Sequence, residues 1–122
     1  MDRVTKVGPG ERTEGGYTAG IVREQAVATT GLWAGLARTE AGVTSGWHHH
    51  GAYETVVYVA AGRFKVESGP GGAEVVEASP GDFVFIPPQT VHRESNPTAE
   101  ESRLIVFRSG TGQPDFNVDG PV

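Results

Sequence analysis

The stretch GDFVFIPPQTVHRESN, residues 81–96, contains the pattern on which the rest of the chain is built. A glycine-led turn precedes a short run of Phe, Val and Ile, and a Pro-Pro break separates that run from a second one. Short runs rich in β-branched and aromatic residues and bounded by Gly and Pro are typical of β-strands. The stretch therefore predicts two strands, over 82–86 and 91–95, joined by a turn.

The same alternation of short apolar runs and turn residues continues in both directions from this stretch. No window shows the 3.6-residue period of an amphipathic helix. Eight such runs in so short a chain predict an all-β fold, a single jelly-roll β-barrel of about eight antiparallel strands. The aromatic residues Trp33, Phe64, Phe83 and Phe85 are expected to pack in its core. The expected strands are 21–28, 32–39, 53–60, 63–68, 73–77, 82–86, 91–95 and 103–108.

The length of 122 residues is that of one domain. Residues 1–19 are polar and glycine-rich, which predicts a flexible N-terminal arm, and residues 20–122 are expected to form the barrel with a C-terminal tail. The tail could dock back on the barrel or on a second subunit. An arm, a tail and the edge strands of an open jelly roll favour a homodimer.

The composition excludes several classes of partner. The net charge is −5 and the pI about 5.3, with basic residues spread singly, so no nucleic acid partner is expected. The chain has no cysteine, so a metal would be bound by nitrogen and oxygen. It has neither a signal-like nor a membrane-spanning apolar stretch, which predicts a soluble, cytoplasmic protein without a membrane partner.

Three of the four histidines are consecutive, His48 to His50. Because side chains alternate along a strand, His48 and His50 should share one face and His49 should lie on the other. Glu54 falls on the face of His48 and His50 if the strand stays regular. Two imidazoles and a carboxylate suit a divalent ion of Fe, Mn, Ni, Cu or Zn. From spacing alone, a histidine patch bonded to backbone or solvent is the alternative.

The segments 42–54 and 81–96 resemble the two signature motifs of the cupin superfamily. The first motif is Gly, five residues, His-x-His, three or four residues, Glu, six residues, Gly. The second is Gly, five residues, Pro-x-Gly, two residues, His, three residues, Asn. The resemblance implies a cupin barrel with one divalent transition metal per chain, bound by His48, His50, Glu54 and His92. The matching residues are Gly42, His48, His50, Glu54, Gly81, Pro87, His92 and Asn96.

The chain departs from these motifs in two places. Gln89 stands where the second motif has glycine, and seven residues rather than six separate Glu54 from Gly62, so that spacing would select Thr55. We expect Glu54 to be the ligand, because a carboxylate halves the charge of the ion and a hydroxyl does not. The extra residue would then lie in the hairpin at 60–62 or in a bulge.

Tyr58 lies in phase with Glu54 and is a candidate catalytic residue, as an acid or a hydrogen-bond donor. The cupin resemblance implies a small-molecule ligand or substrate but no single reaction, since one fold serves many functions. A dioxygenase-type enzyme is the first hypothesis, because cupins with all four ligands include well-known dioxygenases. A non-redox isomerase, cyclase or lyase is the second, and a non-catalytic small-molecule-binding cupin is the third.

Overall fold

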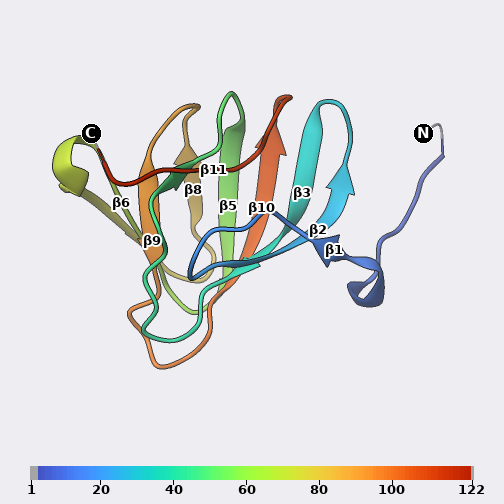
Figure 1. Cartoon of the computed structure of the whole chain (residues 1–122). Helices are drawn as coiled ribbons and strands as arrows, with labels where there is room; N and C mark the ends of the chain where they lie inside the picture. The colour runs from blue at the N-terminus through green and yellow to red at the C-terminus, as the bar shows by residue number, and fades with distance from the viewer. Residues whose placement is uncertain (1–2, 122) are drawn as a thin grey trace.

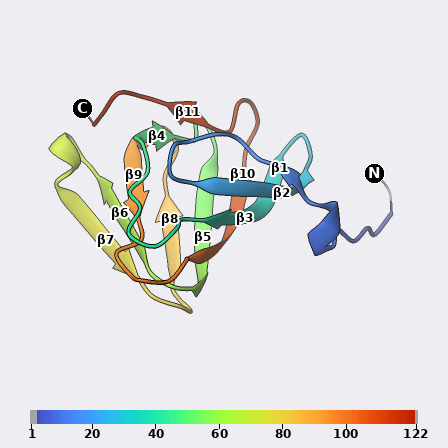
Figure 2. The ribbon, with the colours of Figure 1, turned by 60° about the horizontal axis from the view of Figure 1, so that its bottom comes forward.

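The computed structural model describes residues 3–121. Their strands form two antiparallel sheets that face each other (Figures 1 and 2). The six-stranded sheet has the order β1-β2-β3-β10-β5-β8, and the five-stranded sheet has the order β11-β4-β9-β6-β7. The strands are β1 (Thr13–Glu14), β2 (Val22–Ala28), β3 (Leu32–Arg38), β4 (His48–His49), β5 (Glu54–Ala61), β6 (Phe64–Ser68), β7 (Glu74–Ala78), β8 (Phe83–Ile86), β9 (His92–Ser95), β10 (Arg103–Ser109) and β11 (Phe116–Asn117).

This arrangement confirms the all-β class, and each of the eight expected strands is present with ends shifted by at most one residue. The added strands β1, β4 and β11 are two residues long. Two short 3-10 turns, Pro9–Glu11 and Pro70–Gly72, are the helical elements of the described part. No helix within residues 3–121 has the length and apolar character needed to cross a membrane.

The core lies between the two sheets and is built from alternate positions of the strands. In β5, for example, Val57 and Val59 are buried while Ala60 is exposed. Cross-strand neighbours such as Leu104 and Val106 on β10 continue this apolar layer. Burial on one face of each strand is what fixes the register of the sheet.

Two of the expected core aromatics lie on the outside. Phe83 and Phe85 are 69% and 55% exposed, whereas Val84 and Ile86 between and after them are buried. The apolar run of β8 therefore has a core face and an outward face, and the bulky rings occupy the outward one. The expectation for Trp33 and Phe64 is correct, since both are buried.

Two turns with left-handed backbone shape the end of the barrel that carries the histidines. Gly51 has φ 58° and Gln89 has φ 60°. Gln89 stands where the second motif has glycine, and it adopts the left-handed conformation that glycine would favour there. The Gln89 backbone N–H donates to the Gly51 carbonyl, which joins the two turns. At the other end of β5 the register shifts between Arg103 and Leu104, which places a bulge at Ala60.

The chain ends are attached to the barrel by different means. In the N-terminal arm, β1 pairs with β2, and residues 3–12 extend away from the barrel (Figure 2). At the other end, residues 110–118, here called the C-terminal strap, run across the barrel, where β11 pairs with β4 (Figure 1). The strap therefore docks on its own barrel, beside the histidines.

Candidate metal centre

Three histidines from two strands meet at one end of the barrel. His48 on β4 is paired directly with His92 on β9, and His50 follows two residues later on the same face as His48. All three side chains are buried, and one ring nitrogen of each lies within 4.8 Å of the others. The structure thus brings together the three histidines that the sequence analysis selected.

Each of these rings is oriented by its Nδ1 atom. A carbonyl oxygen can only accept a hydrogen bond, so an Nδ1 within bonding distance of one must carry the proton. In a neutral ring with this tautomer Nε2 has a free lone pair, the form in which imidazole binds metals. The bonds run from His48 to Gly46 (3.0 Å), from His50 to Pro114 (3.0 Å) and from His92 to Thr90 (2.9 Å).

Two of these Nε2 atoms have no hydrogen-bond partner within the described residues. Nε2 of His48 and Nε2 of His92 are buried and accept no hydrogen bond. A buried polar atom without a partner is costly, by about 1–3 kcal/mol. A divalent ion bound by nitrogen ligands would satisfy both atoms, so the donor set fits the metal that the sequence implies.

Burial keeps two of these rings in the metal-binding form. Desolvation lowers the pKa of His50 to about 4 and that of His92 to about 3. In the case of His50, the positive charge of Arg108 acts in the same direction. Both rings are therefore neutral at neutral pH and can offer a lone pair without first losing a proton.

Glu94 is the carboxylate that the structure places at the histidines, and the sequence analysis did not select it. Its Oε1 lies 3.4 Å from Nε2 of His48 and 4.0 Å from Nε2 of His92. Burial would raise the pKa of Glu94, but the contact with His48 and the nearby positive charge outweigh it and lower the pKa to about 2. One signal for Glu94 was available, because it follows His92 by two residues in a strand and so shares its face.

The structure does not bring Glu54 to this group. The chain turns between His50 and Tyr53, with Gly51 in left-handed conformation, so the parity of β4 does not continue into β5. Glu54 is exposed on the outer face of β5, and Thr55 is buried on the inner face. The spacing to Gly62 was the signal that pointed to Thr55 as the inward residue.

Two other residues considered in the sequence also lie outside the group. Tyr58 is on the outer face of β5, where its ring packs against Phe83 with the centroids 4.9 Å apart. The ring of His49 stacks on Phe116 of the strap at 4.8 Å, and its Nδ1 accepts a hydrogen bond from the Gly51 N–H. Neither side chain reaches the three Nε2 atoms in this structure.

A small cavity inside the barrel adjoins the histidine group. Its polar lining is Arg23, His50, Thr55, Glu94 and Arg108, and the rest of its wall is apolar. The hydroxyl of Thr55 is buried there without a hydrogen-bond partner. The volume is about 10 Å³, which is close to the space that one water molecule needs.

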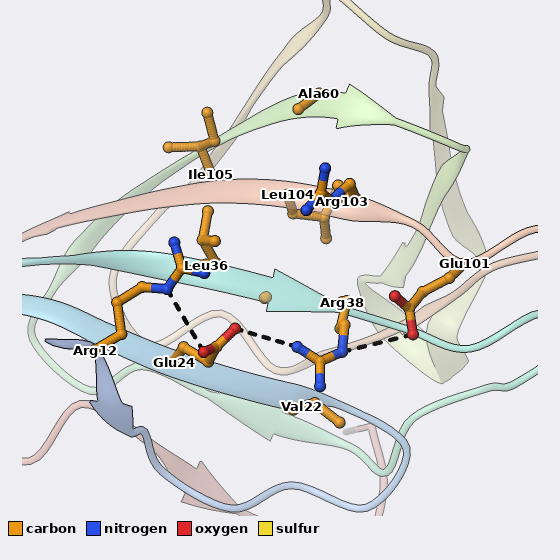
Figure 3. A pocket seen from close by; sticks show the side chains of 11 residues that line it. Arg12, Val22, Glu24, Leu36, Arg38, Ala60, Glu101, Arg103, Leu104 and Ile105 are labelled. Carbon is orange, nitrogen blue, oxygen red and sulfur yellow. Dashed lines mark hydrogen bonds and ion pairs between the residues drawn. The ribbon is translucent and has the colours of Figure 1, made fainter. Parts of the chain in front are cut away.

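A second hollow lies on the outside of the six-stranded sheet (Figure 3). It is larger, about 290 Å³, and a chain of ion pairs crosses it. These pairs are Arg12 with Glu24 (3.5 Å), Glu24 with Arg38 (3.1 Å) and Arg38 with Glu101 (3.5 Å). These ion pairs are partly exposed, as is common at a protein surface. The inner cavity adjoins the histidines, so we place the candidate chemistry in the inner cavity.

The β-barrel thus gathers at one end three histidines that could hold a metal ion. The family model described as a cupin domain matches residues 35–108, more than half of the chain. The chain belongs to the cupin family. No curated protein sequence is close enough to this chain to count as a match.

Several solved structures have a similar fold. KdgF from a Halomonas species is 25% identical, with 88% of this chain and 96% of that one covered and a TM-score of 0.71. The polyketide cyclase RemF from Streptomyces resistomycificus is 16% identical, with 95% and 86% covered and a TM-score of 0.75. An RmlC-like cupin from Shewanella frigidimarina is 21% identical, with 91% and 96% covered and a TM-score of 0.68. The last two show the fold alone.

Proposed function

We propose that this cupin is a metal-dependent enzyme that acts on a small molecule bound in the barrel beside His48, His50 and His92. The observation that carries the proposal is the pair of buried Nε2 atoms, on His48 and His92, that make no hydrogen bond. A structural histidine cluster would be expected to satisfy these atoms by hydrogen bonds. Here all three rings use Nδ1 for that purpose and leave Nε2 free.

We further propose that Glu94, and not Glu54, supplies the carboxylate of the centre. Oε1 of Glu94 lies 3.4 Å from Nε2 of His48 and 4.0 Å from Nε2 of His92, the two nitrogens that would hold the ion. When a metal ion is bound to these nitrogens, the carboxylate offsets half of its charge.

A bound divalent ion would supply a Lewis acid that polarises a substrate oxygen or, if it is redox-active, a centre for oxygen chemistry. The two arginines and the carboxylates around the cavity supply fixed charges beside the substrate. Such charges stabilise charge that develops on a polarised oxygen. They favour the non-redox isomerase, cyclase or lyase class over the dioxygenase class, which is the second candidate.

The experiment begins with metal analysis of the purified protein, followed by chelation and reconstitution with Fe, Mn, Ni, Cu and Zn. We expect about one ion per chain in wild type and none in His48→Ala or His92→Ala, with folding preserved. Turnover of small carbonyl and phenolic compounds is then measured with and without oxygen. Folded wild-type protein that takes up none of the five metals would disprove the proposal, and strictly oxygen-dependent turnover would favour the dioxygenase class.

The expected homodimer is part of this proposal and is supported by the outer face of the six-stranded sheet. Phe107, Phe83 and Phe85 are 44%, 69% and 55% exposed there. Phe107 and Phe85 both pair across strands with Val56, so these rings belong to one continuous apolar face. The ion pairs of Figure 3 border this face with charges of both signs, which a second copy can match.

A further inference from the structure

Two arginines point into the barrel, where an apolar core would normally continue. Arg23 on β2 and Arg108 on β10 each have a side chain that is 2% exposed. Buried arginines are rare unless they are paired, because removing a guanidinium from water is costly. Their presence beside a cavity therefore requires a partner of negative charge.

Arg108 is held in place but only partly paired. Its guanidinium carbon lies 4.4 Å from the centroid of the Trp33 ring, so stacking fixes its plane. Its Nε and Nη1 atoms are buried and have no hydrogen-bond partner among the described residues. Arg108 also lines the inner cavity. The cavity thus has a rigid, charged donor with unused hydrogen-bonding capacity.

The acid nearest to both arginines comes from the C-terminal strap. Oδ1 of Asp115 lies 3.3 Å from Arg108, 3.4 Å from Arg23 and 3.2 Å from Nδ1 of His50. Charge-assisted hydrogen bonds between guanidinium and carboxylate are usually about 2.7–2.9 Å. The contacts of Asp115 are longer, and neither of its oxygens makes a hydrogen bond. One carboxylate is therefore shared loosely between two guanidinium groups.

The charges of the cavity wall balance before a metal binds. Arg23 and Arg108 in the wall are matched by Glu94, which also lines the cavity, and by Asp115, which contacts both arginines from the strap. A divalent ion at the histidines adds two positive charges that no further acid of the wall offsets. The ligand that completes the site is therefore expected to be an anion.

From this arrangement we propose that the cavity binds the carboxylate of a small organic acid on Arg108, where the acid takes the place of Asp115. The inference rests on the proposed function, of which it names the substrate class. Arginine suits this role because its planar fork of donors matches a carboxylate. As the cavity has room for about one water molecule when Asp115 is in place, the strap moves when the acid binds.

The test uses metal-free protein, so that a carboxylate cannot bind to the metal instead. Acetate and pyruvate are titrated and followed by NMR in a carboxylate-free buffer at constant ionic strength, with acetamide as the uncharged comparison. The variants are Arg108→Met and Asp115→Asn. The matched control is Arg103→Met, because Arg103 lies on the same strand as Arg108 but is exposed.

We expect wild type to bind the two acids and not acetamide. Arg108→Met should weaken binding at least tenfold, and Arg103→Met should change it less than twofold. Asp115→Asn should tighten binding about fivefold or more, because it removes the competing carboxylate. A purely structural role for Asp115 would instead lower the melting temperature with no gain in affinity.

Unchanged or weaker binding in Asp115→Asn would overturn the inference, and so would equal binding in the two arginine variants. If Arg108→Met does not fold, Asp115→Asn decides alone. The result is separable from the metal proposal, because His48→Ala protein binds no metal and should still bind the acids. Acid binding without metal uptake would contradict only the metal proposal, and metal uptake without acid binding would contradict only this one.

Discussion

Replacing Glu94 with glutamine separates the two acids that could complete the metal centre. The variant removes one negative charge at nearly constant shape. Its matched control is Glu54→Gln, which makes the same chemical change on the exposed outer face of β5. We expect Glu94→Gln to lose metal affinity and Glu54→Gln to retain it.

The magnitude follows from the charges and distances of the site. A unit charge and a divalent ion about 4 Å apart attract by roughly 8 kcal/mol at an effective dielectric constant of about 20. Most of this is offset by the cost of removing both groups from water. We expect a net loss of about 3 kcal/mol, or roughly 100-fold in Kd. Glu54 is surrounded by solvent, so its replacement should change Kd less than about threefold.

The metal-free state gives an independent readout of the same change. In wild type burial disfavours the Glu94 carboxylate, but the contact with His48 and the nearby positive charge outweigh burial and lower its pKa to about 2, so the ionised group stabilises the folded chain. Metal-free Glu94→Gln should therefore melt at a lower temperature than wild type. Kd is measured by competition with a chromophoric chelator. Wild-type affinity in Glu94→Gln, or a loss in Glu54→Gln of the same size, would refute the reasoning.

Three further predictions concern pH, assembly and the hydroxyl of Tyr58. Burial lowers the pKa of His50 to about 4 and that of His92 to about 3 in the folded protein. As the pH falls, these two histidines are therefore protonated in the unfolded chain, near pH 6.5, before they are protonated in the folded protein. Metal-free protein should then lose about 2–3 kcal/mol of stability between pH 7.5 and 5.5, as measured by urea unfolding, and a constant midpoint would contradict this. Phe85→Glu should convert a dimer to a monomer in light scattering, whereas Val75→Glu, at an exposed apolar site on β7, should not. Tyr58→Phe should leave metal content and turnover unchanged, and a loss of turnover would place its hydroxyl in the reaction.

The fold could be predicted from the sequence because its main strands have clear ends. Each of the eight runs is long enough to show alternation and is closed by Gly, Pro or another turn residue. The strands β1, β4 and β11 could not be found in this way, because two residues show no period. Long-range pairing creates them, such as that of Phe116 with His49.

The candidate site could be predicted only where side chains alternate regularly between the two faces of a strand, here called strand parity. Parity correctly grouped His48 with His50, but it was then carried across the turn at Gly51, where the chain changes direction. This error assigned Glu54 to the inner face. The same rule applied within β9 would have grouped Glu94 with His92. The outward position of Phe85 shows a related limit, since an unbroken apolar run does not show which face is buried.

The C-terminal strap also determines when the site can form during folding. His50 depends on Pro114, 64 residues later in the chain, for the bond that orients its ring. Contacts between such distant residues tend to form late, because closing a long loop costs entropy. The strap pairs with β4 through two residues and is otherwise held by separate contacts, such as that of Gly112 with Tyr53, so we expect this end to open before the rest of the barrel unfolds. Metal release by a chelator should therefore report local opening of the strap, at a rate faster than global unfolding.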